Sequence, residues 1–91
     1  MKCLGIDFGT TSVKGVLFDE ELREIASSTE EYTVKTKGNI VELEPEKYWS
    51  LLQNALKNIR KTSPIDCLSI DTQCETLILT DEYGNPVRDA I

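Results

Sequence analysis

The residues with the clearest chemical character lie close together near the start of the chain. Asp7 ends a short apolar run, Gly9 follows it, and Lys14 lies on the next apolar run. Glycine lets backbone N–H groups come close to anionic oxygens, and lysine supplies a mobile cation. A carboxylate beside a phosphate is favourable when it holds Mg²⁺, so Asp7 predicts a metal nucleotide. The segment therefore predicts a phosphate-binding hairpin, with hydroxyl donors at Thr10, Thr11 and Ser12.

The surrounding pattern predicts strands that position this turn. Residues 3–8 form an apolar run with Leu4, Ile6 and Phe8 on one face. Residues 13–18 and 23–34 have the composition of two further strands, and short polar turns join all three. We therefore expect an antiparallel meander, followed by a polar stretch at 35–39 and a short extended piece at 40–43.

A helix is predicted from Pro45 to about Lys61. Proline is favourable at a helix start, and basic residues near the end complement the helix dipole. Apolar residues recur at helical spacing, which places on the core face Tyr48, Trp49, Leu52, Ala55, Leu56 and Ile59. After the helix, residues 65–71 predict a buried strand, residues 77–80 another, and residues 81–86 a turn into an extended segment at 87–91.

Composition excludes several classes of function. The 91 residues carry a formal net charge of −6, which opposes binding to nucleic acid or to an anionic membrane. Neither a signal peptide nor a membrane span is recognisable, so the expected compartment is the cytoplasm. The chain has three cysteines and no histidine, which argues against a disulfide scaffold, a zinc site and histidine-based catalysis. We expect Cys3 and Cys67 to lie in the core and Cys74 to be buried and inert.

On spacing alone, a plain β-turn with a solvated Lys14 is an equally good interpretation. Resemblance favours the phosphate turn. The pattern Asp-x-Gly-Thr-x-x-x-Lys at residues 7–14, continued by Gly-Val-Leu-Phe-Asp at 15–19, resembles the first phosphate loop of the actin and sugar-kinase superfamily. Leu-Glu-Pro-Glu at 43–46, Ile-Asp-Thr-Gln-Cys-Glu-Thr at 70–76 and Gly-Asn-Pro at 84–86 resemble the FGGY carbohydrate kinases in particular.

This resemblance implies an α/β, ribonuclease H-like half-domain of the actin/hexokinase superfamily. Members of the family are several times longer, with two such domains beside a cleft. We therefore expect residues 1–91 to be an incomplete N-terminal kinase domain, without the second, nucleotide-binding domain. The implied reaction is phosphoryl transfer from Mg·ATP to a hydroxyl of a sugar, ketose or polyol, and the chain alone is expected to be inactive.

Family roles carry over where residues match. Asp7 resembles the magnesium-linked aspartate, and Lys14 the cation near the transferred phosphoryl group. The ATP-phosphate loop corresponds to Gly9, Thr10, Thr11 and Ser12. The predicted substrate strand contains Gln73, Cys74 and Glu75. Glu75 matches the glutamate of glycerol kinases, but Cys74 replaces an arginine and so removes a planar set of donors for hydroxyl oxygens. No residue matches the family's general base, so none is assigned.

Three alternatives remain open from the sequence. The chain resembles, more distantly, an ATPase activator of the same superfamily. It could also be a sugar-binding protein without catalysis, or an assembly module that self-associates through unpaired strand edges. The full-length protein is expected to bind a small sugar or polyol, without nucleic acid or membrane, with a homodimer as one possible state.

Overall fold

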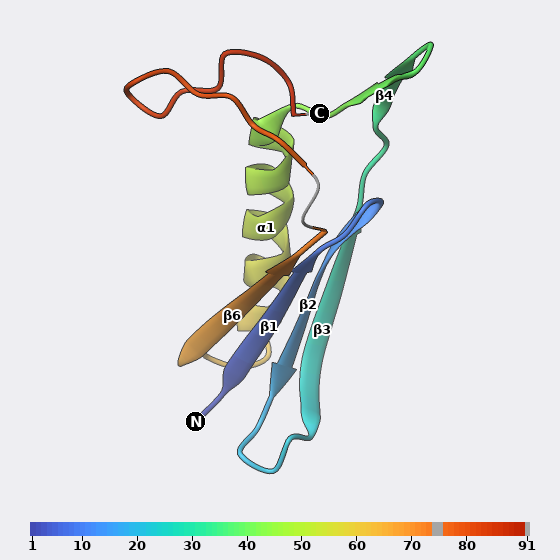
Figure 1. Cartoon of the computed structure of the whole chain (residues 1–91). Helices are drawn as coiled ribbons and strands as arrows, with labels where there is room; N and C mark the ends of the chain where they lie inside the picture. Colours follow the sequence, from blue (N-terminus) through green and yellow to red (C-terminus); the bar gives the residue numbers. More distant parts are fainter. Residues whose placement is uncertain (74–75, 91) are drawn as a thin grey trace.

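The fold is described from a computed structural model, which covers residues 1–73 and 76–90. Its main sheet has four strands in the order β3-β2-β1-β6, and one helix lies along one face (Figure 1). The elements are β1 (Cys3–Phe8), β2 (Ser12–Phe18), β3 (Glu24–Glu31), β4 (Lys35–Lys37), β5 (Ile40–Glu42), α1 (Pro45–Arg60) and β6 (Cys67–Thr72). Cys74 and Glu75, both predicted substrate residues, lie outside the described residues, as does Ile91.

The predicted meander is confirmed, because β1 pairs antiparallel with β2, and β2 with β3. The chain then crosses the sheet through α1 and returns as β6. This strand lies parallel to β1 and forms the edge of the sheet opposite to β3. Parallel neighbours need such a crossover, and a helix covering the sheet provides it. Because β1 and β6 are parallel and in register, their C-terminal ends lie at the same end of the sheet.

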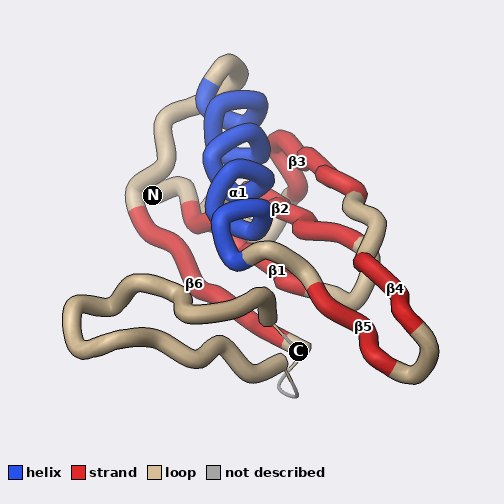
Figure 2. The backbone as a smooth tube through the Cα atoms, turned by 90° about the horizontal axis from the view of Figure 1, so that it is seen from above, coloured by secondary structure: helices blue, strands red, loops and turns tan. Residues whose placement is uncertain are grey.

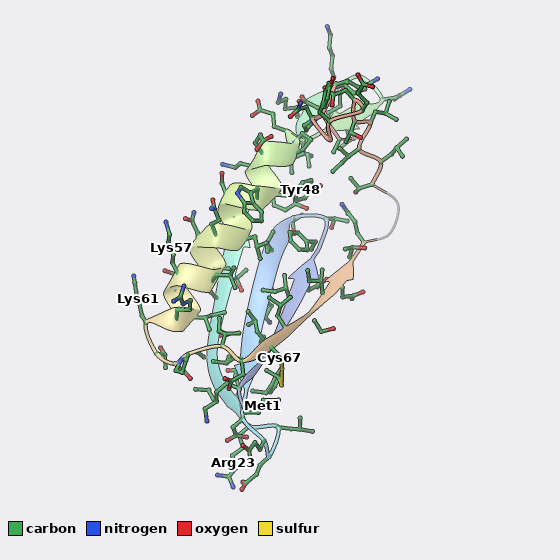
Figure 3. The ribbon with its side chains drawn as sticks, turned by 90° about the vertical axis from the view of Figure 1, so that its left-hand side faces the viewer. Met1, Arg23, Tyr48, Lys57, Lys61 and Cys67 are labelled. Atoms are coloured by element: carbon green, nitrogen blue, oxygen red, sulfur yellow. A yellow bond between two sulfur atoms is a disulfide. The ribbon has the colours of Figure 1, made fainter. Side chains whose placement is uncertain are left out.

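The core lies between α1 and the sheet. Alternate strand residues point toward the helix, and the buried ones are Leu4, Ile6, Val13 and Leu17. The helix contributes Leu51, Ala55 and Ile59, while Lys57 and Lys61 point away from the sheet (Figure 3). A Cβ on Gly15 would lie 2.9 Å from Ile59 Cδ1, so the missing side chain lets α1 approach β2. Close helix packing thus depends on glycine at this strand position.

The helix is confirmed, but one predicted core residue is wrong. Trp49 is 57% exposed, whereas Leu51 is buried. Successive helical residues are rotated by about 100°, so a buried stripe through Leu51, Ala55 and Ile59 leaves Trp49 at its margin. The sequence pattern gave the period correctly but placed the centre of the apolar face too far toward Trp49.

The strand after the helix also differs from expectation. It begins at Cys67, and every residue of β6 is exposed, with Leu68 and Ile70 each 53% exposed. β6 is an edge strand, and α1 packs on β2 and β3 instead. The apolar residues of β6 therefore match a buried strand in composition, but none of the described elements covers them.

Two further expectations are corrected in the peripheral segments. Residues 35–37 are not simply polar loop, because β4 and β5 form a hairpin closed by Gly38 at a φ of 63°. Residues 77–80 are not a strand: only an isolated bridge joins Thr80 to Pro86 around the predicted turn. In that turn, the Asp81 side chain accepts hydrogen bonds from the N–H groups of Tyr83 and Asn85, both at 2.9 Å.

The C-terminal segment returns to the start of the helix, as the view from above shows (Figure 2). Leu43 and Ala90 exchange backbone hydrogen bonds of 3.0 and 2.7 Å. Lys35 Nζ lies 2.6 Å from Asp89 Oδ2 and 3.2 Å from Glu44 Oε1. These contacts hold the β4–β5 hairpin, the helix start and the end of the chain together.

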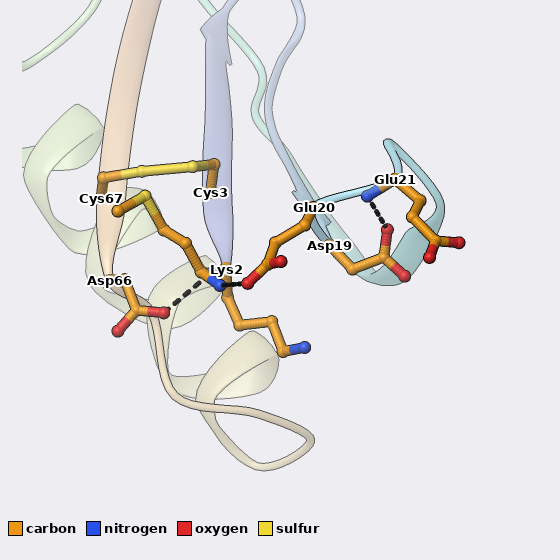
Figure 4. A network of polar contacts seen from close by, with 8 residues as sticks. Lys2, Cys3, Asp19, Glu20, Glu21, Asp66 and Cys67 are labelled. Carbon is orange, nitrogen blue, oxygen red and sulfur yellow. Dashed lines mark hydrogen bonds and ion pairs between the residues drawn. A yellow bond between two sulfur atoms is a disulfide. The ribbon is translucent and has the colours of Figure 1, made fainter.

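The cysteines contradict the expectation of buried thiols. Cys3 and Cys67 are exposed, and a disulfide joins them across β1 and β6 (Figure 4). They are register partners with Cα atoms 4.9 Å apart, within the usual range for a disulfide. Next to them, the Lys2 N–H donates to Asp66 Oδ2 at 2.7 Å. Within the described part of the chain, no helix has the length and hydropathy to cross a bilayer.

Candidate functional site

The predicted phosphate turn is the tight connection between β1 and β2. The Gly9 N–H donates to Ser12 O at 2.9 Å, so this N–H closes the hairpin. Thr10 and Thr11 form the exposed tip. Gly9 does not have a left-handed φ, and a Cβ there would meet only Ser12 O at 3.4 Å. The backbone of the turn therefore does not itself require glycine.

Tyr32, which sequence reasoning missed, contacts this turn at two points. Its hydroxyl donates to Gly9 O, and its backbone N–H donates to Thr11 O at 2.9 Å. Tyr32 is only 8% exposed, and burial together with the neighbouring Tyr48 raises the pKa of its hydroxyl to about 12. The hydroxyl consequently remains a hydrogen-bond donor across the physiological pH range.

Asp7 and Lys14 occupy one row across the sheet with a third charged residue, Asp71. Asp7 is the register partner of Lys14 on β2 and of Asp71 on β6, and all three are exposed on the face opposite α1. They line a shallow hollow of about 360 Å³ together with Gly5, Val16, Phe18 and Ser69. Sequence reasoning gave no role to Asp71, although both aspartates are the fifth residues of their strands.

Two neighbouring carboxylates repel each other unless a cation lies between or beside them. Mg²⁺ is commonly held by one or two carboxylates together with phosphate oxygens and water. Among the described residues no group of three or more acidic, cysteine or histidine side chains gathers in a metal-ligand arrangement. The donor set at Asp7 therefore fits a magnesium ion shared with phosphate better than an ion held by protein alone.

Gln73 is the one predicted substrate residue that the structure describes. Its backbone N–H donates to Phe8 O at 3.0 Å, which fixes the end of β6 against β1. Its side-chain Nε2 donates to Thr76 Oγ1 and lies 3.5 Å from Tyr48 Oη. A cavity of about 320 Å³ opens here, lined by Phe8, Pro45, Tyr48, Thr72, Gln73, Thr76 and Ile78.

The predicted residues are thus only partly brought together. Thr10 and Gln73 border a common cavity of about 360 Å³, next to Tyr48 and Thr76. Asp7 and Lys14 border the hollow on the other face of the sheet, although the turn that carries Thr10 directly joins their strands. The charged hollow at Asp7 and Lys14 and the less charged cavity at Thr10 and Gln73 therefore lie on opposite faces of the sheet, near the turn.

Residues 2–91 match the family model described as the N-terminal domain of the FGGY family of carbohydrate kinases. The chain is 37% identical over 95 residues to a glycerol kinase of Marinomonas sp., covering 97% of this chain and 19% of the relative. It is 32% identical to a glycerol kinase of Alkaliphilus metalliredigens with the same coverage. The chain therefore spans about a fifth of the length of the curated relatives that it matches.

Solved structures agree with this assignment. A gluconate kinase from Lactobacillus acidophilus matches 99% of this chain with a TM-score of 0.92 and 26% identity, over 19% of its own length. The Plasmodium falciparum glycerol kinase, solved with ADP, matches 99% of this chain with a TM-score of 0.85 and 30% identity, over 20% of its own length. With the family model matching almost every residue, this chain belongs to the FGGY family of carbohydrate kinases.

Proposed function

We propose that this chain forms the first part of a kinase that transfers the γ-phosphoryl group of ATP to a hydroxyl of a sugar, ketose or polyol. One observation carries the proposal: Asp7 and Lys14 face each other on β1 and β2, directly below the exposed turn tip at Thr10 and Thr11. An acid, a base and a hydroxyl-rich turn in this arrangement suit a metal-bound nucleotide phosphate. The glycerol and gluconate kinases among its relatives support the substrate class.

In this proposal the turn binds phosphate and the strands supply charge. Thr10 and Thr11 N–H groups donate to no backbone carbonyl among the described residues, so they are available to an anion. Their hydroxyls and that of Ser12 add donors, and Lys14 neutralises negative charge on the phosphates. Asp7 would hold Mg²⁺, with Asp71 as its neighbour on β6. Bound Mg²⁺ neutralises phosphate charge and orients the phosphoryl group.

The acceptor would bind at the end of β6. Gln73 offers amide donors and an acceptor, and Glu75 would accept hydrogen bonds from sugar hydroxyls. With cysteine at position 74, the sequence after β6 offers no guanidinium donors for a polyol at that position. We therefore propose a sugar, ketose or polyol whose hydroxyl groups are recognised by the Glu75 carboxylate and the Gln73 amide.

The catalytic base and the adenosine pocket are proposed to lie in the part of the kinase outside residues 1–91. This chain alone should therefore bind phosphate weakly and turn over no sugar. Its exposed apolar residues on β6, Leu68 and Ile70, favour self-association of the isolated chain as a second candidate behaviour. A mass that rises with concentration would support it, and a single monomeric mass from micromolar to millimolar would exclude it.

The proposed compartment is the cytoplasm, where ATP and small sugars are available, and no nucleic acid or membrane partner is proposed for a chain of this charge. A non-catalytic sugar-binding protein and an ATPase activator of the same superfamily are the alternatives to the kinase. Each would leave Asp7 and the phosphate turn unchanged, so only ADP release that depends on a sugar separates them from the kinase. A homodimer of the full-length protein is compatible with all three functions.

The experiment measures ADP release by the full-length protein with Mg·ATP and a panel of glycerol, pentitols, ketoses and gluconate. We expect release with one member of the panel, lost by at least about a hundredfold in Asp7→Asn. Glu24→Gln is the matched control, since it also neutralises an exposed strand carboxylate but lies at the other end of the sheet. Sugar binding without release across the panel would overturn the kinase in favour of the binding protein.

A further inference from the structure

The two hydrogen bonds from Tyr32 fix more than the position of the turn. The peptide bonds of the described chain are all trans, so the N–H of Thr10 points opposite to the C=O of Gly9 with which it shares a peptide plane. When the Tyr32 hydroxyl holds Gly9 O, the Thr10 N–H is turned away from Tyr32. The second bond, from the Tyr32 N–H to Thr11 O, holds the other side of the tip.

Tyr32 is itself held by aromatic neighbours from two other elements. Its ring meets Tyr48 of α1 edge to face, with centroids 5.5 Å apart. Tyr48 in turn meets Phe8, the residue before Gly9, at 6.2 Å, also edge to face. Edge-to-face pairs favour one relative orientation of the two rings and stabilise it beyond the burial of their area. The Tyr32 hydroxyl therefore has little freedom to leave Gly9 O.

We propose that Tyr32 is a positioning residue for nucleotide binding: its hydroxyl orients the Gly9–Thr10 peptide so that the Thr10 N–H is presented to a phosphate oxygen, and Tyr48 holds Tyr32 in place. The inference rests on the proposed kinase function for its ligand, ATP. Tyr32 acts through the turn backbone and touches no reacting atom. A flexible turn would have to be ordered each time phosphate binds, and this ordering weakens affinity.

The test compares Tyr32→Phe with the unchanged full-length protein. Removal of the hydroxyl should raise the KM for Mg·ATP about five- to tenfold, the equivalent of one hydrogen bond, with the KM for the sugar within about twofold of the original. Amide hydrogen exchange at Gly9, whose N–H closes the turn on Ser12 O, should become faster without any nucleotide present. Replacement of Tyr32 by 4-aminophenylalanine, which keeps a donor at the same position, should restore both values.

Tyr83→Phe is the matched control, because it removes the same group from a residue that is 81% exposed. Unchanged exchange at Gly9 in Tyr32→Phe would overturn the hydrogen-bond role. Faster exchange with unchanged affinity for Mg·ATP, measured by calorimetry, would overturn the positioning role. Hydrogen exchange is measured without substrate. A protein that binds nucleotide but phosphorylates no sugar would therefore contradict the proposed kinase, while exchange and nucleotide affinity would still test the role of Tyr32.

Discussion

Asp7 and Asp71 are register partners on the parallel strands β1 and β6, and both side chains are exposed on the face opposite α1. Adjacent strands lie about 4.8 Å apart, so the two carboxylates repel each other, although Lys14, the partner of Asp7 on β2, offsets part of this repulsion. The pair arises from the crossover through α1, which aligns residues 64 positions apart in register along β1 and β6. This relationship gives a signature for metal binding that is independent of turnover.

Asp71→Asn should therefore act in opposite directions with and without metal. In metal-free protein it removes repulsion and should raise the free energy of unfolding by a few tenths of a kcal/mol. With Mg²⁺ and nucleotide it should lower the gain in melting temperature that ligand binding provides. Asp7→Asn should abolish that gain. Thermal unfolding with and without Mg·ADP measures both, and an equal gain in all three proteins would rule out metal binding at this pair.

The disulfide between Cys3 and Cys67 should stabilise the chain measurably. It closes a segment with a sequence separation of 64, for which chain entropy predicts about 4 kcal/mol. Both cysteines are exposed, so a reductant reaches the bond, and in a reducing compartment the pair would be free thiols. Urea unfolding with and without dithiothreitol measures the difference.

The double variant Cys3→Ser, Cys67→Ser is the control for this prediction, because a reductant should not change its stability. Cys74 remains in that variant, so any residual effect of reductant would report on Cys74. If the unchanged protein has the same midpoint in oxidising and reducing buffer, the disulfide does not contribute to stability. Thiol titration of the folded protein gives the oxidation state directly.

Gly15 should be much less tolerant of a side chain than Gly5 on the neighbouring strand. A Cβ at Gly15 would lie 2.9 Å from Ile59 Cδ1 and 3.2 Å from Ile6 Cδ1, whereas a Cβ at Gly5 would lie 4.0 Å from Val16 O. We expect Gly15→Val to lower the free energy of unfolding by about 1–3 kcal/mol through overpacking. Gly5→Ala, the control, should be neutral or slightly stabilising.

A double-mutant cycle identifies the contact that limits Gly15. Ile59→Val removes the Cδ1 that a Cβ at position 15 would meet, so Gly15→Ala should be less destabilising in that background. Chemical denaturation of the four proteins gives the coupling energy. Additive effects would mean that the close approach of α1 to β2 is not set by this pair.

The elements with local signals could be predicted from the sequence, and their burial could not. Alternation gave the meander, and Pro45 with a 3.6-residue period gave α1, because turn and helix signals lie within the segment itself. The exposure of Trp49 and of β6 depends on where α1 lies across the sheet, which no local pattern records. The apolar composition of residues 65–71 therefore predicted a buried strand, whereas β6 is an exposed edge strand.

Some residues of the candidate site could likewise be predicted from the sequence, whereas others are recognised only in the fold. Asp7, Gly9 and Lys14 were found because their spacing along the chain carries the chemistry. The pairing of Asp71 with Asp7, and of Cys67 with Cys3, depends on the parallel register, which is set only when β6 pairs with β1. The sequence places Tyr32 only within a predicted extended segment, because its contact with Gly9 spans 23 residues and its partner is a backbone carbonyl.

The β2–β3 turn makes a pH-dependent contribution to stability through Asp19. Its carboxylate accepts hydrogen bonds from the N–H groups of Arg23 and Glu21, at 3.0 and 2.9 Å. These bonds, that from Arg23 foremost, hold the pKa of Asp19 below its ordinary value of 3.8. A lowered folded-state pKa means that this stabilisation is complete above about pH 3.8 and is lost as the pH falls through the folded pKa.

Asp19→Asn keeps an acceptor oxygen but no longer titrates. The variant should be slightly less stable than the original at pH 7, because a charged acceptor forms the stronger hydrogen bonds. The difference should shrink as the pH falls below about 3.8, since protonated Asp19 loses the same advantage. Asp81 also accepts hydrogen bonds from backbone N–H groups in its own turn and also has a lowered pKa. It is present in both proteins, so its contribution to the pH dependence cancels from the difference between them. Melting temperatures of both proteins between pH 2 and pH 7 test this, and a difference that stays constant over that range would show that the Asp19 carboxylate does not favour its charged form in the folded chain.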